Sequence, residues 1–372
     1  MHKKKKEYKK RGIGWTILRI FLGAAGILVL VLVVYIGYLF ASYHRIEDNL
    51  ELEVEKPAEG NVDETLKTGT EYSALTYNIG FGAYTPDFSF FMDGGKSSWA
   101  KSKKSVLKTV KNAGNLTKSY DPDFALIEEV DLNSTRSYHV NEYELLKESF
   151  PEYDSVFTQN YDSAFLFYPF TQPHGRSRSG LALFSRYPVT SALRRSFPVS
   201  TSFTKFFDLD RCYSISRVPA ENGKELVIFE LHMSAYGNSD AIRESQISML
   251  CNDMKAEYEA GNYVLCGGDF NHDLKASEDD STEHESWAYP FPREDLPEHF
   301  TFCLDLLSEE EKDDLWDSAR NADMEYVPGV TYTVTLDGFI ISDNLECLSY
   351  ENINSGYSYS DHDPVYLKFK LK

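Results

Sequence analysis

An apolar stretch near the N-terminus constrains this chain most, because it separates a segment suited to lipid from a much longer segment suited to water. Residues 20–40 contain no charged side chain. At about 1.5 Å per residue, a helix of this length matches the ~30 Å hydrocarbon core of a bilayer. We therefore predict a basic tail over residues 1–12 and a transmembrane anchor over residues 13–43.

The charge on the two sides of this stretch predicts its orientation. Residues 1–45 carry six Lys and three Arg against one Glu, a balance of +8, so with a net charge of −20 the remainder carries about −28. Because basic residues favour the cytoplasmic side, we expect a single-pass protein of the cell membrane with a cytoplasmic N-terminus and an extracellular main domain. A cleaved signal is the alternative, but the stretch is longer than a signal core and Leu39-Phe40-Ala41 is a poor cleavage site.

The rest of the chain divides into an acidic stretch and a domain. Residues 44–70 are acidic, poor in aromatic side chains and without a clean period, which predicts a stalk. Over residues 71–372, β-rich runs alternate with helical runs, which predicts one α/β (α+β) domain. The predicted strands are Ser73–Tyr77, Phe124–Glu128, Gly180–Arg186, Glu225–His232, Tyr263–Cys266, Gly338–Ser342 and Val365–Leu371, and the predicted helices are Ser97–Leu116 and a run from Ser239 or Asp240 to Met254.

Several chemistries lack their sequence signatures. The chain has no P-loop, no dinucleotide fingerprint and no Cys-x5-Arg motif, so we expect neither a nucleotide cofactor nor thiol catalysis. Its five cysteines show no C-x-x-C or zinc-finger spacing, so we expect neither a zinc site nor a disulfide framework. An acidic domain repels polyanions unless it is locally basic or loaded with metal.

Ligand-type side chains follow several predicted strands at the point where each strand ends. Asn78 follows Leu75-Thr76-Tyr77, Glu129 follows Ala125-Leu126-Ile127, His232 ends one strand and Asp269 follows another. One edge of the sheet core can gather these side chains into a single pocket. Asn271 follows Asp269 closely, and Asp361-His362 near the C-terminus adds a carboxylate and an imidazole. Oxygen ligands suit Mg²⁺ and an imidazole can move protons, which predicts hydrolysis of a phosphate ester.

These motifs, in this order, resemble the endonuclease/exonuclease/phosphatase superfamily, which includes deoxyribonuclease I and the neutral sphingomyelinases. The resemblance covers about Tyr72 to Leu371 and implies a four-layer α/β/β/α sandwich, in which two packed mixed β-sheets are flanked by helices. The motifs that carry it are Thr76-Tyr77-Asn78-Ile79, Ile127-Glu128-Glu129-Val130, Leu231-His232, Gly268-Asp269-Phe270-Asn271, Leu336-Asp337-Gly338-Phe339-Ile340 and Ser360-Asp361-His362.

The resemblance also implies a metal site. Glu129 matches the glutamate that binds the catalytic Mg²⁺, with Mn²⁺ or Ca²⁺ as alternative ions. Asn78 and Asp361 match positions that complete or border that site.

The remaining matched positions imply acid–base and phosphate-binding roles. Asp269 and Asn271 match the pair that orients the attacking water and the scissile phosphate. His362 matches the histidine that contacts phosphate or transfers a proton, and Asp337 matches the aspartate that holds its ring. His232 matches a second histidine of the deoxyribonuclease and sphingomyelinase branches, where it is a candidate general acid.

Two positions depart from the family pattern. Glu128 stands where Gln is common, and an extra carboxylate there could alter metal affinity. Gly338 stands where many relatives have an aromatic or basic residue, which puts substrate contacts near it in doubt. Neither change removes a ligand.

Other residues bear on the substrate less directly. The guanidinium groups of Arg176 and Arg178 can hold a phosphate through paired hydrogen bonds, although a plain solvated loop is the alternative. Four aromatic-rich stretches could line a site, stack on bases or meet a bilayer, although core packing explains most of them: Phe88–Phe91 with Trp99, Phe165–Phe170, Phe203–Phe207 and Trp287–Phe291. The other histidines are expected on surfaces or loops: His139, His174, His272, His284 and His299.

Three functions follow from these expectations. The first is a membrane-anchored, outward-facing, Mg²⁺-dependent phosphodiesterase acting on a lipid headgroup or another extracellular phosphodiester. The second is a surface nuclease of the deoxyribonuclease I type. The third is a catalytically inactive ectodomain that binds a partner.

Overall fold

The computed structural model describes residues 12–57, 65–199, 209–234, 240–276 and 288–372. Its two compact units are Met1–His44 and Arg45–Lys372. The first unit contains the 30-residue helix α1 (Ile13–Ser42), whose most apolar 18-residue window has a mean hydropathy of 2.8 and is not buried. This helix is long and apolar enough to be a membrane span or a signal sequence.

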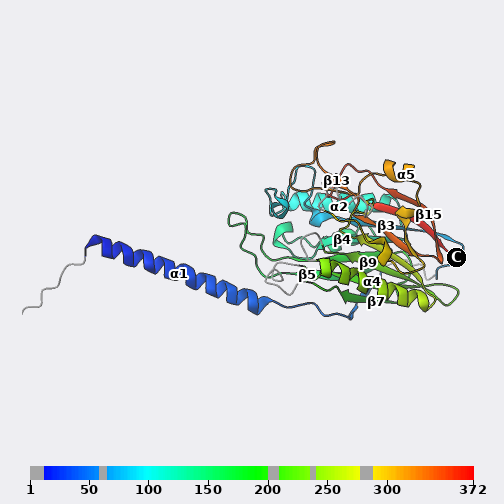
Figure 1. Cartoon of the computed structure of the whole chain (residues 1–372), viewed down its shortest axis with the longest axis horizontal. Coiled ribbons are helices and arrows are strands. Elements are labelled where there is room, and N and C mark those ends of the chain that lie inside the picture. Colours follow the sequence, from blue (N-terminus) through cyan, green and yellow to red (C-terminus); the bar gives the residue numbers. More distant parts are fainter. Residues whose placement is uncertain (1–11, 58–64, 200–208, 235–239, 277–287) are drawn as a thin grey trace, which may run out of the picture. The chain divides into compact units, whose positions relative to one another are not determined.

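Two mixed β-sheets form the second unit, with a short β12–β13 pair beside them (Figure 1). In both sheets most neighbouring strands are antiparallel, and β9–β10 and β3–β4 are the parallel pairs among the described residues. The first sheet has the order β1 (Leu50–Leu52), β7 (Ser191–Ser196), β8 (Cys212–Pro219), β9 (Glu225–His232), β10 (Tyr263–Asp269), β14 (Asp337–Ser342) and β11 (Phe300–Phe302). The second has the order β15 (Leu345–Asn352), β16 (Val365–Leu371), β3 (Glu71–Asn78), β4 (Phe124–Asp131), β6 (Arg178–Ser185), β5 (Asp154–Asp162) and β2 (Val54–Glu55). The short pair is β12 (Ala319–Arg320) with β13 (Thr333–Val334).

Helices cover the outer faces of the two sheets. Helix α2 (Lys103–Ser119) buries Val106 and Val110 in one hydrophobic cluster with β3 and β4 of the second sheet. Helix α4 (Asp240–Glu259) buries Leu250 and Met254 in a cluster with β9 and β10 of the first sheet. Figure 1 shows α2 and α4 on opposite sides of the paired sheets. The predicted four-layer α/β/β/α sandwich is confirmed. Two shorter helices are α3 (Glu142–Lys147) and α5 (Glu309–Asp314).

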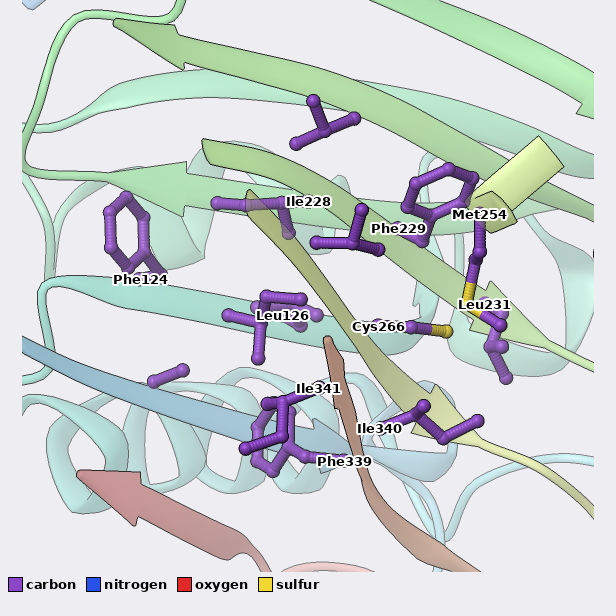
Figure 2. Close-up of a cluster of buried hydrophobic side chains, with 14 of the residues drawn as sticks. Phe124, Leu126, Ile228, Phe229, Leu231, Met254, Cys266, Phe339, Ile340 and Ile341 are labelled. Carbon is purple, nitrogen blue, oxygen red and sulfur yellow. The ribbon is translucent and has the colours of Figure 1, made fainter. Parts of the chain in front are cut away.

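The space between the sheets is filled by side chains that alternate along each strand (Figure 2). Leu126 of β4 shares this cluster with residues of the first sheet, including Ile228 of β9 and Phe339 of β14, all fully buried. This packing holds the strand ends of both sheets in fixed positions, and the candidate site is built on those ends.

Phe229→Ala is expected to lower the free energy of unfolding by about 3–5 kcal/mol, because it leaves a cavity between the first sheet and helix α4. Leu306→Ala is the matched control, since Leu306 is 55% exposed and its loss should change stability by less than about 0.5 kcal/mol. Thermal unfolding of the full chain in detergent, followed by near-ultraviolet circular dichroism, would measure both. Equal melting temperatures for the two variants would contradict this account of the core.

The predicted strands of the central sheets are present, but the predicted stalk differs from the structure. Leu50–Leu52 pairs with β7 and Val54–Glu55 pairs with β5, so part of residues 44–70 forms edge strands of the two sheets. The sequence Leu50-Glu51-Leu52-Glu53-Val54-Glu55 alternates apolar and acidic residues, which is the strand period. Leu52 and Val54 pack against the core cluster, and this apolar burial favours strand pairing despite the acidic residues between them.

The first predicted helix also begins later than expected. It starts at Lys103 rather than near Ser97, because the Ser102 hydroxyl accepts a hydrogen bond from the backbone N–H of Ser105 and caps the helix. The Trp99 indole instead donates to the carbonyl of Pro173 at 2.7 Å.

Candidate functional site

A cavity of about 510 Å³ opens where β3, β4, β9 and β10 end. It gathers six of the residues predicted from the sequence and several that were not predicted. The predicted lining residues are Glu129, His232, Asp269, Asn271 and His362, joined by the predicted Asp361, and the unpredicted ones include Arg136, Asn160, Tyr161, Arg211 and Arg320. The strand ends therefore converge as the sequence pattern indicated.

Asp269 lies at the centre of the site, almost completely buried. Its Oδ2 accepts a hydrogen bond from Asn78 Nδ2 at 3.0 Å. The same oxygen lies 3.5 Å from His232 Nε2 and 3.8 Å from His362 Nε2. Burial is the main cause that raises the pKa of Asp269 to about 7. The nearby Asp337 carboxylate raises this pKa further, whereas His362 and the hydrogen bonds to Asp269 lower it. A carboxylate between two imidazoles is well placed to exchange a proton with water.

The turn after β10 depends on a glycine. Gly268 has a φ of +142°, and a Cβ there would lie 2.0 Å from the carbonyl oxygen of Leu231 in β9. The close approach of the two strands places Asp269 opposite His232 in the parallel register. The Asn271 backbone then donates to Asp269 Oδ1 at 2.8 Å, and its side chain donates to the carbonyl of Met233 at 3.0 Å.

Glu129 reaches the cavity through a bulge in β4. The register with β6 shifts between Ile127 and Val130, and Glu129 has a φ of +56°. A bulge turns a side chain away from its normal alternation, and a strained non-glycine backbone of this kind occurs often at functional sites. Burial raises the pKa of Glu129, Arg136 opposes that effect, and the Asp361 carboxylate adds to it.

His362 is held by Asp337 at the start of β14. Its Nδ1 lies 2.8 Å from Asp337 Oδ2, and the same oxygen accepts a hydrogen bond from the Ser318 hydroxyl at 2.7 Å. Asp337 is fully buried and does not line the cavity. The resemblance implied that Asp337 holds the His362 ring, and this contact is the geometry that the prediction requires.

The two histidines of the site have opposite charge preferences. Burial lowers the pKa of His362, but the carboxylates of Asp337 and Asp269 outweigh it and raise that pKa well above its ordinary value. For His232, burial and the nearby Arg211 lower the pKa well below the ordinary value. His362 is therefore suited to hold a proton and His232 to remain neutral, which makes His362 the better proton donor of the two in this state.

The donor groups of the site fit a divalent cation. Ligand atoms of Asp269, Asp337 and His362 lie within 4.8 Å of one another, and Asp337 Oδ1 is buried without a hydrogen-bond partner among the described residues. Burial raises the pKa of Asp93, which also lines the cavity, to about 7, and the carboxylates of Asp361 and Glu129 add to that rise. These three carboxylates therefore lie near one another. Clustered carboxylate oxygens are the ligands that hard divalent ions prefer.

Asn78 is oriented at the edge of this carboxylate group. Its side-chain oxygen accepts a hydrogen bond from the backbone N–H of Gly80 at 3.0 Å, while its amide nitrogen donates to Asp269. These bonds fix which end of the amide faces each neighbour. Asn78 does not itself line the cavity.

The two departures from the family pattern lie away from the cavity. Glu128 is buried between the sheets, where its Oε1 accepts from the Thr76 hydroxyl at 2.8 Å, and burial and Glu230 raise its pKa well above the ordinary value. A neutral carboxylic acid resembles the amide of Gln in shape and charge. Gly338 packs against Leu274 and Tyr350, since a Cβ there would lie 2.8 Å from Leu274 Cδ1.

The arginines that line the cavity differ from those predicted. Arg176 donates to Asp162 at 2.8 Å and Arg178 to Gln159 at 3.2 Å, and neither lines the cavity, so their binding of substrate phosphate stays a prediction. The cavity instead contains Arg136, Arg211 and Arg320.

Arg211 is the most available of these three guanidinium groups. It is 7% exposed, and its Nε and Nη1 have no hydrogen-bond partner within the described part of the chain. Arg136, by contrast, is bound to Asp131 through two hydrogen bonds. A charged residue directly before a strand was the signal that could have identified Arg211.

Two of the other histidines lie in loops, as expected, but are not at the surface. His174 and His272 are buried, and burial lowers the pKa of each to about 4. His174 lines the cavity, whereas His272 bonds its own loop through the carbonyl of Phe270 at 2.6 Å. His139 and His299 are exposed, and His284, Phe203–Phe207 and Trp287 lie outside the described residues.

Asp337→Asn is expected to lower turnover about 10- to 100-fold, because the amide can no longer orient the His362 ring as a carboxylate does. The apparent affinity for activating metal should change much less. Metal titrations of steady-state hydrolysis separate the two quantities. An equal loss of both would make Asp337 a metal ligand instead.

Comparisons with known proteins agree with this geometry. The sequence profile of the Endonuclease/Exonuclease/phosphatase family matches residues 75–305. No curated protein sequence matches the chain significantly.

Solved structures share the fold at low sequence identity. An endonuclease/exonuclease/phosphatase from Beutenbergia cavernae has a TM-score of 0.56 and 14% identity, over 81% of this chain and 72% of that one. TDP2 of D. rerio, complexed with a single-strand DNA product, has a TM-score of 0.54 and 14% identity over 81% and 100% of the two chains. The human Nocturnin catalytic domain, with a bound sulfate anion, has a TM-score of 0.51 and 18% identity over 81% and 95%.

Proposed function

The chain belongs to the endonuclease/exonuclease/phosphatase family, and from this premise we propose that it is a membrane-anchored, outward-facing phosphodiesterase that uses Mg²⁺ to hydrolyse a lipid or other extracellular phosphodiester. Family members are metal-dependent phosphoesterases and nucleases. The anchor is α1, and the basic residues before it support a cytoplasmic N-terminus.

The carboxylates of the cavity are the residues that would hold the cation. We assign Glu129 and Asp361 as ligands, with Asn78 at the border of the site, and the Asp269, Asp337 and His362 group is the alternative location. A bound Mg²⁺ would stabilise negative charge on the phosphoryl oxygens, and Mn²⁺ or Ca²⁺ could serve in its place.

The chain's own residues supply the other parts of the reaction. Asp269 would accept a proton from the attacking water, because its pKa of about 7 suits a base at neutral pH. Asn78 and Asn271 would keep that carboxylate in place. His362, protonated and held by Asp337, would bind a phosphoryl oxygen or donate a proton to the leaving group.

Two further cavity residues would contact the phosphate. Arg211 would hold a non-bridging oxygen with its available nitrogens. His232, kept neutral, would donate a hydrogen bond rather than act as a cationic acid.

This proposal rests mainly on the Asp269 carboxylate, which lies within 4 Å of two imidazoles in a cavity also lined by Glu129 and Asp361. The test is hydrolysis by the full chain in detergent, with Mg²⁺ or with EDTA, against sphingomyelin, phosphatidyl lipids, inositol phosphates, plasmid DNA and RNA. Hydrolysis of a lipid diester only with Mg²⁺ is the expected result. Activity that persists in EDTA would refute the metal-dependent chemistry.

A surface nuclease is the second candidate. The structural similarity to a TDP2 complexed with a single-strand DNA product, and the three arginines of the cavity, favour it. Cleavage of plasmid DNA without lipid turnover would select this function. No turnover of any substrate by a folded, metal-binding chain would instead favour an inactive binding ectodomain.

A further inference from the structure

The loop between β5 and β6, residues 163–177, exposes an aromatic surface beside the cavity. Phe167, Tyr168 and Phe170 are 50%, 65% and 85% exposed, although they lie within four residues of one another. The Tyr168 ring lies 5.9 Å from that of Phe91, next to the exposed Met92, which lines the cavity. Large apolar side chains gathered in this way usually mark a binding surface.

The base of this loop is held by hydrogen bonds. Leu166 and Gly175 exchange two backbone hydrogen bonds of 3.0 Å, and the backbone N–H of His174 donates to the carbonyl of Tyr168 at 3.1 Å. The Trp99 indole also bonds the carbonyl of Pro173. The three rings therefore extend from a loop whose base is hydrogen-bonded. Packing within the domain does not account for their exposure to water.

The composition of the loop differs from the rest of the chain. Residues 163–177 contain no Asp or Glu, although the chain has 58 of them in 372 residues. An acidic loop would be repelled by anionic lipid headgroups, and this loop avoids that repulsion. Aromatic side chains without acidic neighbours are typical of segments that lie in the interface of a bilayer.

The loop lies at the end of the domain where the chain enters it. Arg194 of β7 donates to the carbonyl of Gln159, three residues before β5 ends, at 2.8 Å. The same guanidinium donates to the carbonyls of Ile46 at 3.4 Å and Glu47 at 2.9 Å. The end of β5, which leads into the loop, and residues 46–47 are thus joined through one buried side chain.

Further contacts fix the entering segment and connect it to the cavity. Arg45 forms an ion pair with Asp210 at 2.6 Å, and the backbone of Ser196 bonds Asp48 at 2.8 Å. Asn160 at the end of β5 and Arg211 beside Asp210 both line the cavity. Only Tyr43 and His44 separate Arg45 from the last residue of α1.

We propose that the tip of this loop, Phe167–Phe170, inserts into the headgroup region of the phospholipid bilayer that α1 spans, and that it turns the cavity toward lipid headgroups in the same membrane. This inference rests on the proposed membrane anchoring and deepens the proposed function, because it names a phosphodiester in a lipid headgroup as the substrate class. The alternatives are that a protein partner or a second copy of the chain covers the loop tip, and the experiments below separate both from lipid.

Fluorescence quenching tests the membrane contact without any enzyme activity. Phe170→Trp is introduced into the full chain in a Trp15→Phe background and reconstituted into phosphatidylcholine vesicles with brominated or ordinary acyl chains. Its added fluorescence should fall by roughly half or more with brominated lipid, because interfacial side chains lie ~5–10 Å into the headgroup and acyl boundary. Leu306→Trp in the same background is the control and should not be quenched. Equal emission of Phe170→Trp in both kinds of vesicle would overturn the proposal.

Kinetics test whether the contact serves the reaction. The variant Phe167→Ser, Tyr168→Ser, Phe170→Ser changes exposed side chains that do not line the cavity. In vesicles of phosphatidylcholine and sphingomyelin, its lipid hydrolysis should fall about tenfold, since each buried aromatic ring contributes to interfacial binding. Hydrolysis of soluble bis(4-nitrophenyl) phosphate should be unchanged.

The outcomes distinguish the loop from the proposed activity. Loss of both hydrolyses in the loop variant would place the loop in the catalytic structure and overturn the membrane role. Full lipid turnover in the variant, or protection of the tip by self-association in crosslinking without lipid, would also overturn it. If the parent hydrolyses neither substrate, the proposed function fails, while the quenching result still decides the membrane contact.

Discussion

Replacing Glu129 by glutamine is expected to lower metal-dependent hydrolysis by about a thousandfold, because a metal ion contributes several kcal/mol of charge stabilisation and each 1.4 kcal/mol corresponds to about tenfold in rate. Glutamine keeps the size of the side chain and removes its charge. The bulge that turns Glu129 into the cavity is made by the backbone, so the fold should be retained. The measurement is the rate of diester hydrolysis against Mg²⁺ concentration.

The control for this variant is Glu310→Gln in the exposed helix α5, which should leave the rate unchanged. Circular dichroism of both variants checks that the sheets are intact. Activity of Glu129→Gln within a few-fold of the parent would remove Glu129 from the metal site. A rate that recovers at high Mg²⁺ would show that its role is in metal affinity rather than turnover.

His362→Ala is expected to lower turnover by about 10²- to 10⁴-fold, the range for loss of a general acid or base. The imidazole is the group that joins the buried Asp337 to the cavity, and its Nε2 points toward Asp269. Removing it leaves the Asp337 carboxylate buried without its strongest partner. The variant should therefore also be less stable, by about 3–5 kcal/mol at the upper limit.

The chain offers a matched control in His299→Ala. His299 Nδ1 lies 2.7 Å from Asp343 Oδ2, a similar pair, but both side chains are about half exposed and do not line the cavity. Its loss should change neither turnover nor stability noticeably. His362→Gln keeps a polar side chain at the site, so an inactive but stably folded His362→Gln would separate catalysis from stability. Equal turnover in His299→Ala and His362→Ala would refute the assignment.

Strand ends could be located from the sequence because local patterns specify them. The apolar run before Asp269 predicts a strand, Gly267 and Gly268 allow the close approach that follows, and the carboxylate comes at the turn. The same reasoning placed His232 and Glu129 at the ends of two other strands, which belong to different sheets. Their side chains meet in one cavity because both sheets present these ends at the same edge.

Other features depend on contacts that are distant in the sequence. The acidic residues 50–55 form edge strands because β7 and β5 offer unpaired backbone groups, which composition cannot reveal. Arg176 and Arg178 were the arginines expected at the phosphate, yet they bond residues of the neighbouring strand β5. Arg211 enters the cavity because the register of β8 with β9 brings its start next to His232.

The amino-acid sequence was sufficient for the membrane-length helix and for the strand ends that carry the site residues, because each depends on a short pattern of apolar, polar and glycine residues. The sandwich fold was implied by the resemblance of its motifs to a known family. Only the folded chain showed that β1 pairs with β7 and β2 with β5, and which arginines line the cavity. It also showed that the pKa of His362 is raised while that of His232 is lowered. Burial and neighbouring charge set these properties, and both arise from residues that come together only when the two sheets pack.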